Sequence, residues 1–185
     1  MEWLNEPRDW SDENGLIRAV TELKTDFWRA TFYGWTTDNG HFYHRPATGD
    51  FTAEALVSAA HTTRFDQAGL MVRAGERTWL KTGLEVTSGA IQVSTVLTDD
   101  FSDVSMTPVP GFTGEIALRV TRFDSALAVH YRNGAGPWQL LRLGHLPLPG
   151  TVDVGVMCCS PERAGLEATF RDFRVGPPLS REGLE

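Results

Sequence analysis

Residues 65–99, FDQAGLMVRAGERTWLKTGLEVTSGAIQVSTVLTD, decide the fold that we predict for this chain. The stretch contains three β-prone runs, and the apolar residues of each run fall on alternate positions, as on the buried face of a strand. They are Leu70 and Val72, then Leu80, Leu84 and Val86, then Ile91, Val93 and Leu97. We therefore predict three consecutive antiparallel strands that bury one shared face.

The turn between the second and third runs sets their pairing. Ser88-Gly89 has the length of a two-residue hairpin loop, with a glycine to adopt a positive φ. This turn places Glu85 opposite Gln92 and Lys81 opposite Val96, and it pairs apolar with apolar residues on the other face. A shift of one residue would mix the two faces, so we predict this register.

The turn between the first and second runs, around residues 75–77, needs an odd number of residues to keep the same faces aligned. Arg73 and Met71 then lie beside Lys81 on the neighbouring strand. Lys81 and Glu85 are separated by roughly 13 Å along one strand, at about 3.3 Å per residue. They do not form one simple ion pair, so each needs another partner or a ligand.

The second face of these strands differs from an ordinary solvated surface, which would be richer in Lys, Glu and Thr. It carries a Trp, a Met and two Gly among single charged residues. The side chains that we predict to bind a ligand from this face are Gln67, Met71, Arg73, Trp79, Lys81, Glu85, Gln92 and Ser94. Trp79 is either a stacking surface or a packing residue, and Gly69 and Gly83 either leave a hollow or relieve strand curvature.

Size and composition favour one globular domain. The 185 residues are 41% hydrophobic and 22% charged, which is typical of soluble folded proteins. We expect a single domain over residues 1–175 and a flexible, Pro-rich C-terminal tail over residues 176–185. The formal net charge of −7 argues against nucleic-acid and anionic-membrane partners, because both favour basic surfaces.

The chain also lacks the sequence features of an exported or membrane-spanning protein. No window holds about 20 consecutive apolar residues. The acidic start, MEWLNEPRDWSDENG, has neither the basic residues nor the apolar run of a signal peptide. We therefore expect a cytoplasmic protein, on the condition that the chain is full length.

Turn-forming pairs recur at short intervals, from Asn14-Gly15 to Pro149-Gly150, and separate short β-prone runs. Outside the central three, the clearest runs are residues 16–21, 51–60, 116–123, 126–132, 152–160 and 168–175. No long helical pattern competes with them, and short turns are expected near residues 100–105. Many short strands with turns between them predict an all-β sandwich.

An aromatic segment, TDFWRATFYGWTTDNGHFYH at residues 25–44, holds more rings than one core face needs. Most of these rings either fill the core or line a groove beside the polar face of the central strands. In the second interpretation Trp28, Trp35, His41 or Tyr43 lies next to that face. Trp28 and His41 therefore join the predicted ligand-binding set.

The two cysteines, Cys158 and Cys159, are adjacent. Neighbours on a strand point to opposite faces, so we do not expect a disulfide between them. Cys158 continues the apolar series of Val152, Val154 and Val156 and is predicted to lie in the core. Cys159 is on the other face and is expected to be accessible, either as an ordinary thiol or as a nucleophile.

Several motifs together resemble those of a known family. They are Trp3 with Asn5-Glu6-Pro7, TDFWR at 25–29, DNGH at 38–41, FDQAGLMVR at 65–73, WLKTGLE at 79–85, VGVMCCSP at 154–161 and EATFRDFRV at 167–175. The series resembles a concanavalin A-like domain family of unknown function that includes the regulation of enolase protein. This resemblance implies a concanavalin A-like lectin/glucanase sandwich, a jelly roll of two curved antiparallel sheets. It also implies a concave face where relatives of the fold bind or cleave sugars, but no particular reaction.

Binding without catalysis is the function that we predict first, with a carbohydrate or sugar-derived metabolite held on the concave face. Aromatic rings would stack on the sugar, and the polar side chains would bind its hydroxyl groups. A phosphorylated or anionic sugar would suit Lys81 and Arg73, although Glu85 limits the negative charge that the site tolerates. Regulatory interaction with another protein is an alternative, if the aromatic segment exposes an apolar patch.

Glycoside hydrolysis is the enzymatic alternative. It needs two carboxylates, about 5 Å apart in retaining enzymes and about 6.5–9.5 Å apart in inverting ones. Glu85 stands alone on its strand and is the candidate catalytic residue. The second carboxylate would come from Glu6, Asp26, Asp38, Asp66 or Asp99. The Glu-x-Asp-x-Glu pattern common in glucanases of the implied fold is absent, which favours a non-enzymatic role. No cofactor or metal is expected, because His41 and His44 would point to opposite faces of an extended segment.

Overall fold

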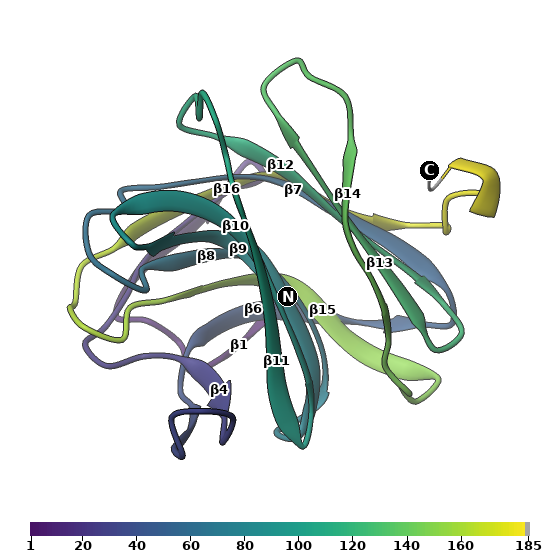
Figure 1. The fold of residues 1–185 in the computed structure, drawn as a ribbon, viewed down its shortest axis with the longest axis horizontal. Coiled ribbons are helices and arrows are strands. Elements are labelled where there is room, and N and C mark those ends of the chain that lie inside the picture. The colour runs from purple at the N-terminus through teal and green to yellow at the C-terminus, as the bar shows by residue number, and fades with distance from the viewer. Residues whose placement is uncertain (184–185) are drawn as a thin grey trace.

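The computed structural model describes residues 1–183, which form two large antiparallel sheets stacked face to face and a small third sheet (Figure 1). The first sheet has the strand order β1 (Glu2–Leu4), β6 (His41–Thr48), β15 (Thr151–Cys159), β8 (Gln67–Gly75), β9 (Thr78–Thr87), β10 (Ala90–Asp99) and β11 (Phe101–Pro108). The second sheet has the order β14 (Gln139–His145), β13 (Ala126–Asn133), β12 (Ile116–Phe123), β7 (Phe51–Ala59), β16 (Glu167–Gly176), β3 (Leu16–Val20) and β2 (Asp9–Glu13). The predicted all-β sandwich of two antiparallel sheets, a jelly roll, is confirmed.

The third sheet is a hairpin of β4 (Phe27–Arg29) and β5 (Thr36–Asp38).

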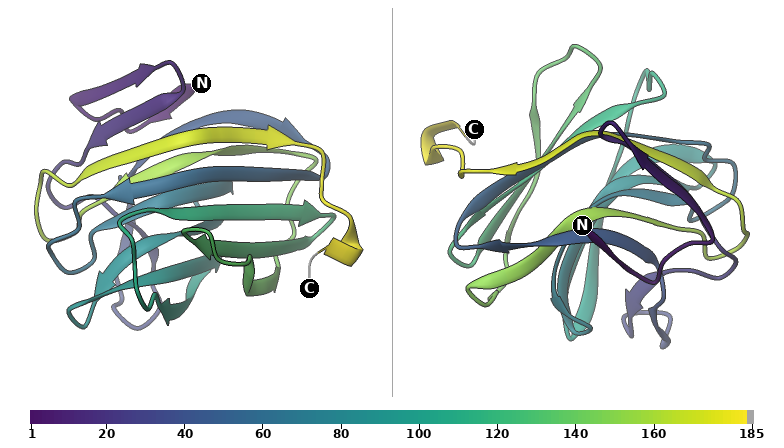
Figure 2. Two further views of the ribbon diagram at one scale, coloured as in Figure 1. Left: turned by 90° about the horizontal axis from the view of Figure 1, so that it is seen from above. Right: turned by 180° about the vertical axis from the view of Figure 1, so that it is seen from behind.

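Figure 2 (left) shows the second sheet from above, with β16 in yellow between β7 and the purple N-terminal strands. The chain crosses between the two large sheets several times, for example from β6 to β7 and from β15 to β16, as in a jelly roll.

The C-terminal segment after β16 contains one 3₁₀ turn, η1 (Arg181–Gly183). Leu179 donates its backbone N–H to the hydroxyl of Thr52, 3.0 Å away. Residues 184–185 of the predicted tail lie outside the described residues, and the flexibility of the tail stays a prediction. Within residues 1–183 the structure has no helix that is long and apolar enough to cross a membrane.

The register predicted for the central strands is confirmed. Strand β9 pairs with β10 so that Glu85 lies opposite Gln92 and Lys81 lies opposite Val96. The connecting turn is Ser88-Gly89, whose residues have φ values of 52° and 74°. Two consecutive positive φ values are those of the two-residue turn that matches the twist of a hairpin.

In the hairpin of β8 and β9, an irregularity in the pairing keeps the apolar faces of the two strands on the same side of the sheet. The register shifts between Arg73 and Gly75, which adds one residue to the first strand. This makes the connection odd-numbered, as predicted, and places Met71 opposite Lys81.

The inward-facing residues of both sheets form the main core. Leu70, Leu84 and Val93 of the first sheet join Ile116 and Val129 of the second sheet in this core, and all five are fully or almost fully buried. Burial of a side chain of this size contributes about 1.5–3 kcal/mol. Because successive strand residues alternate between faces, the intervening residues of β8, β9 and β10 point to the outer face of the first sheet.

Gly69 and Gly83 allow two strands to approach closely. They lie opposite each other on β8 and β9. A Cβ atom added to Gly69 would lie 1.9 Å from the carbonyl oxygen of Thr82, and one added to Gly83 would lie 2.2 Å from that of Ala68. Both atoms would meet backbone instead of open space. These glycines therefore allow β8 and β9 to approach each other closely. They do not leave the hollow in the outer face that was the alternative interpretation.

The segment near residues 100–105, expected to hold short turns, is largely strand β11. Asp100 makes the turn, with a φ of 61°, and Phe101 then pairs with Asp99. Strand β11 is the edge of the first sheet and exposes about half of its residues. Burial imposes little apolar pattern on such a strand, so its sequence does not predict it.

The β4–β5 hairpin covers part of the outer face of the first sheet. The strands of that sheet curve, and β4 lies within the curve (Figure 1). Beneath the hairpin is a second apolar cluster, in which Phe27 of β4 packs with Met71, Trp79 and Met157. The hairpin therefore divides this face into a covered part and an open part, which holds the candidate site.

Candidate functional site

A cavity of about 290 Å³ lies on the outer face of the first sheet, beside the β4–β5 hairpin. Its polar floor consists of Asp26, Gln67, Lys81 and Glu85. Its aromatic wall consists of Trp28, Tyr33, Trp35 and Phe65. The rest of the lining is Lys24, Thr37, Val96, Val104, Met106 and Pro161. The volume is at the lower end of the range of about 300–1,000 Å³ that is usual for small-ligand pockets.

Lys81 and Asp26 form a buried ion pair in the polar floor. Lys81 Nζ lies 3.1 Å from Asp26 Oδ1, and the Lys81 side chain is 3% exposed. Burial by itself would lower the pKa of the amine, but nearby negative charge, that of Asp26 above all, holds this pKa above its usual value. The prediction that Lys81 needs a partner other than Glu85 is confirmed.

Glu85 is the second carboxyl group of the polar floor and is almost fully buried. Burial raises its pKa, and the charge of Lys81 and a hydrogen bond with Ser94 offset this rise only in part. Glu85 lies opposite Gln67 on β8, so a carboxyl and an amide group are neighbours. The floor thus presents groups that can both donate and accept hydrogen bonds.

Cys159 lies beneath the polar floor. Its Sγ is 3.6 Å from Gln67 Oε1 and 3.8 Å from Asp26 Oδ1. Burial raises the pKa of the Cys159 thiol well above its usual value. The expectation of an accessible thiol is wrong, and a buried protonated thiol is not an activated nucleophile. Cys158 lies in the main core as predicted, where burial raises its pKa to about 12, and both thiols are free.

The aromatic wall comes mainly from the β4–β5 hairpin. Tyr33 and Trp35 stack with ring centroids 4.7 Å apart and an interplanar angle of 19°. Tyr33 also meets Trp28 edge-on, with centroids 5.6 Å apart. The indole N–H of Trp28 donates to the carbonyl oxygen of Thr31 at 3.0 Å. Trp28 is buried and Trp35 is 53% exposed, so the wall combines a fixed ring with a solvent-accessible one.

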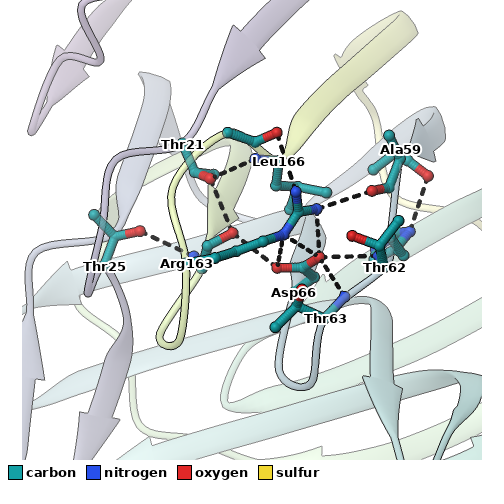
Figure 3. Close-up of polar contacts among 12 residues, drawn as sticks. Thr21, Thr25, Ala59, Thr62, Thr63, Asp66, Arg163 and Leu166 are labelled. Atoms are coloured by element: carbon teal, nitrogen blue, oxygen red, sulfur yellow. Dashed lines mark hydrogen bonds and ion pairs between the residues drawn. The ribbon is translucent and has the colours of Figure 1, made fainter.

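Asp66 and Arg163 join two loops at the rim of the cavity (Figure 3). Arg163 Nη2 and Nε donate to Asp66 Oδ2 at 2.6 and 2.9 Å, and the side chain of Asp66 is fully buried. The backbone N–H groups of Thr62 and Thr63 and the hydroxyl of Ser160 donate to the same carboxylate. Burial would raise the pKa of Asp66, but these donors hold it below its usual value.

This rim network positions two lining residues. Phe65 directly precedes Asp66, and Pro161 directly follows Ser160. Phe65 has a φ of 64°, a backbone conformation that costs a residue other than glycine about 1–3 kcal/mol. Its N–H donates to the carbonyl oxygen of Val86 at 2.8 Å. The surrounding hydrogen bonds therefore hold Phe65 in an unfavourable conformation at the edge of the cavity.

Trp79 and Met71 do not reach the cavity. Both are 0% exposed and pack beneath the hairpin in the cluster that contains Phe27. The ring centroids of Phe27 and Trp79 are 6.2 Å apart. Trp79 offers no stacking surface to a ligand, because β4 covers it, so its packing role is the correct interpretation.

His41 and Arg73, also predicted to bind a ligand, are bonded to protein groups instead. His41 Nε2 accepts from the backbone N–H of Glu22 at 3.1 Å, and Nδ1 lies 2.6 Å from the carbonyl oxygen of Asn5. Arg73 donates two hydrogen bonds of 2.7 Å to the carboxylate of Asp38. Neither residue lines the cavity, so the structure assigns both to structural positions.

Gln92 and Ser94 of β10 are next to the site without lining the cavity. Gln92 donates to the hydroxyl of Thr87 at 2.5 Å, and Ser94 is hydrogen-bonded to Glu85. Ser94 therefore acts on the site through Glu85. The members of the predicted set that do line the cavity are Trp28, Gln67, Lys81 and Glu85.

Of the five carboxylates considered as partners of Glu85 in hydrolysis, Asp26 lines the same cavity. The others, Glu6, Asp38, Asp66 and Asp99, do not, and Asp38 and Asp66 are bound to arginines. Among residues 1–183, no group of three or more His, Cys, Asp or Glu side chains is arranged to hold a metal ion.

Several lining residues lie outside the predicted set, among them Tyr33, Trp35, Phe65, Val104 and Met106. The signal for Tyr33 and Trp35 was the excess of rings at residues 25–44. Both interpretations of that segment hold in part, because its other rings include buried ones. Val104 and Met106 come from β11, whose pattern is weak. Phe65 reaches the cavity through loop geometry that no sequence pattern indicates.

The chain matches known proteins over nearly its whole length. Residues 3–178 match the family described as "Protein of unknown function (DUF1349)". The chain is 39% identical to Regulation of enolase protein 1 of Saccharomyces cerevisiae over 179 residues, which cover 97% of this chain and 90% of that protein. The crystal structure of a functionally unknown protein from S. cerevisiae is similar, with a TM-score of 0.93 and 39% identity over 97% of both chains.

More distant solved structures share the fold alone. The carbohydrate binding module CBM66 from Bacillus subtilis has a TM-score of 0.59 and 11% identity over 94% of both chains. The Bacteroides ovatus protein described as Xyloglucan PUL GH43B has a TM-score of 0.69 and 22% identity, over 89% of this chain and 34% of that one. The family match and the 39% identical yeast relative show that this chain belongs to the DUF1349 family of proteins of unknown function.

Proposed function

We propose that this protein binds a carbohydrate or sugar-derived metabolite in the cavity without converting it, and that its sandwich is of the concanavalin A-like kind. The observation that carries the proposal is the presence of an aromatic wall and a polar floor in one cavity. The apolar ring faces of a sugar can stack on the aromatic wall, and its many hydroxyl groups can form hydrogen bonds with the polar floor.

The polar floor is ordered before any ligand binds. Lys81 is paired with Asp26, and Glu85 is hydrogen-bonded to Ser94. Gln67 is almost fully buried beside Cys159. Side chains that are already held in place lose little conformational freedom on binding, which lowers the entropic cost of association.

The comparisons are compatible with the proposal and do not name a ligand. The likeness to a carbohydrate binding module concerns the fold, at 11% identity. The printed name of the yeast relative refers to regulation of enolase. A regulatory contact with another protein is accordingly the outcome that a negative binding result would favour.

A thermal-shift screen of the purified protein against mono- and oligosaccharides tests the proposal. A ligand that binds the folded state raises Tm in a saturable manner. Trp35→Ala and Gln67→Leu should remove the shift, because both residues line the cavity. The control Trp138→Ala should keep it, because Trp138 packs against Arg119 of the second sheet. If none of the saccharides raises Tm, sugar binding is contradicted.

Glycoside hydrolysis is the second candidate, favoured by the shared location of Glu85 and Asp26 in the cavity. Burial raises the pKa of Glu85, as in a general acid, while Asp26 is paired with Lys81. Release of the aryl group from aryl glycosides measures this activity. Turnover that disappears in both Glu85→Gln and Asp26→Asn would establish hydrolysis, and binding without turnover would support the non-catalytic role.

A further inference from the structure

The charged groups of the cavity favour a ligand that carries no negative charge. We infer that the cavity takes neutral or amino sugars and rejects phosphorylated and carboxylated ones, an inference that rests on the proposed sugar binding. Although Glu85 limits the negative charge that the site tolerates, the sequence also leaves an anionic ligand open, because such a ligand would suit Lys81 and Arg73. The contacts of these two residues correct that expectation.

Both cations already have carboxylate partners. Lys81 Nζ is 3.1 Å from Asp26, and its side chain is 3% exposed. A phosphate bound to Lys81 would leave the carboxylate of Asp26 without its partner in a buried place, which is strongly unfavourable. Arg73 makes two hydrogen bonds of 2.7 Å to Asp38 and does not line the cavity.

Glu85 is then the buried ionisable group of the cavity lining that has no direct counter-ion among the described residues. It forms no ion pair with any of residues 1–183, although Lys81 is near enough to influence its titration. An ionised Glu85 repels a phosphate and attracts an ammonium group. A protonated Glu85 donates to a hydroxyl oxygen, so a neutral sugar is accommodated in either state.

The rest of the lining acts in the same direction. The faces of aromatic rings attract cations and repel anions, and four rings line the cavity. Lys24 also lines the cavity, but it is an exposed residue, so water and salt screen its charge. The formal net charge of −7 further disfavours the approach of anions.

Isothermal titration with nine probes tests the inference: glucose, galactose and mannose, each as the neutral sugar, the 2-amino sugar and the 6-phosphate. One like charge in a partly buried site changes affinity by about tenfold or more. We therefore expect at least one neutral or amino form to bind about tenfold more tightly than its phosphate. Glu85→Gln should narrow this ratio severalfold, whereas the control Trp138→Ala, at a residue outside this cavity, should leave the ratio unchanged.

The outcomes separate this inference from the proposal on which it rests. If a 6-phosphate binds as tightly as its neutral form or more tightly, sugar binding stands and the charge selection is wrong. Loss of that phosphate binding in Lys24→Gln would identify the rim lysine as the anion contact. If none of the nine probes binds at millimolar concentration and the screen of mono- and oligosaccharides gives no thermal shift, sugar binding itself is contradicted, and the charge selection falls with it.

Discussion

Asp66 and Arg163 form an ion pair in which the carboxylate is fully buried and the side chain of the arginine is 24% exposed. The pair joins the loop before β8 to the loop after β15, and these strands are neighbours in the first sheet. Asp66 also accepts hydrogen bonds from Thr62, Thr63 and Ser160. Loss of this one carboxylate would therefore leave several donors without an acceptor at the rim of the cavity.

Asp66→Asn should destabilise the fold by about 3 kcal/mol, because it leaves a partly buried guanidinium without its counter-ion. This figure is at the lower end for buried pairs, since Arg163 reaches solvent in part. Urea unfolding measures the change. The control is Arg8→Gln, which removes an exposed pair with Glu22 and should leave stability unchanged. Equal effects of the two substitutions would show that the rim network is not structural.

The same carboxylate should contribute to acid unfolding. Its pKa in the folded protein lies below the ordinary value of 3.8, so the unfolded state binds more protons below that pH. The stabilisation is complete above pH 3.8 and is lost as the pH falls through the folded pKa. Urea midpoints from about pH 6 to pH 2 should therefore fall more steeply for the wild type than for Asp66→Asn.

Gly83→Ala should destabilise the protein by about 3 kcal/mol or more, because its Cβ would lie 2.2 Å from a backbone carbonyl oxygen. Backbone of a central sheet cannot move away as a flexible side chain can. Gly75→Ala, at the end of the neighbouring strand β8, is the matched control, since a Cβ there meets nothing within 4 Å. It should be neutral or stabilising by about 0.4–1 kcal/mol in urea unfolding. Tolerance of Gly83→Ala would mean that β8 and β9 are farther apart.

The pairing of β9 with β10 could be predicted from the sequence because it depends on nearby residues. The Ser88-Gly89 turn and the alternation of apolar residues together exclude a shifted register. The same alternation assigns Lys81 and Glu85 to the outer face. It does not show what covers that face, because Phe27 reaches Trp79 from a distant part of the sequence. A strand pattern identifies a face, whereas exposure on that face depends on the loops packed above it.

The hydrogen-bond partners of the predicted site residues could not be predicted from the sequence for the same reason. Arg73 is bonded to Asp38 of β5, and His41 to groups of two separate loops. Each contact spans a large distance in the sequence and leaves no periodic pattern. The aromatic excess at residues 25–44 indicated that rings surround the site, but only the hairpin geometry separates the buried rings from the accessible ones.

Lys81 and Asp26 should behave as one energetic unit. Lys81→Met or Asp26→Asn alone leaves a buried charge without its partner and should cost about 3–5 kcal/mol. The double substitution should cost less than the sum of the two, with a coupling energy of about 1–3 kcal/mol. Unfolding of the four proteins in urea measures this cycle. Additive effects would mean that the pair is open to solvent, and Lys81 would then be available to an anionic ligand.

Trp35 and Trp79 should separate binding from stability. Trp35→Ala should change stability little, because the side chain is 53% exposed, but it should abolish the sugar-induced rise in Tm. Trp79→Ala should cost about 3–5 kcal/mol, because it empties a fully buried site beneath the hairpin. Urea unfolding and the thermal shift, measured on both variants, distinguish the two roles. If Trp79→Ala folds stably and loses the sugar response while Trp35→Ala keeps it, the hairpin must open on binding and expose the floor that β4 covers.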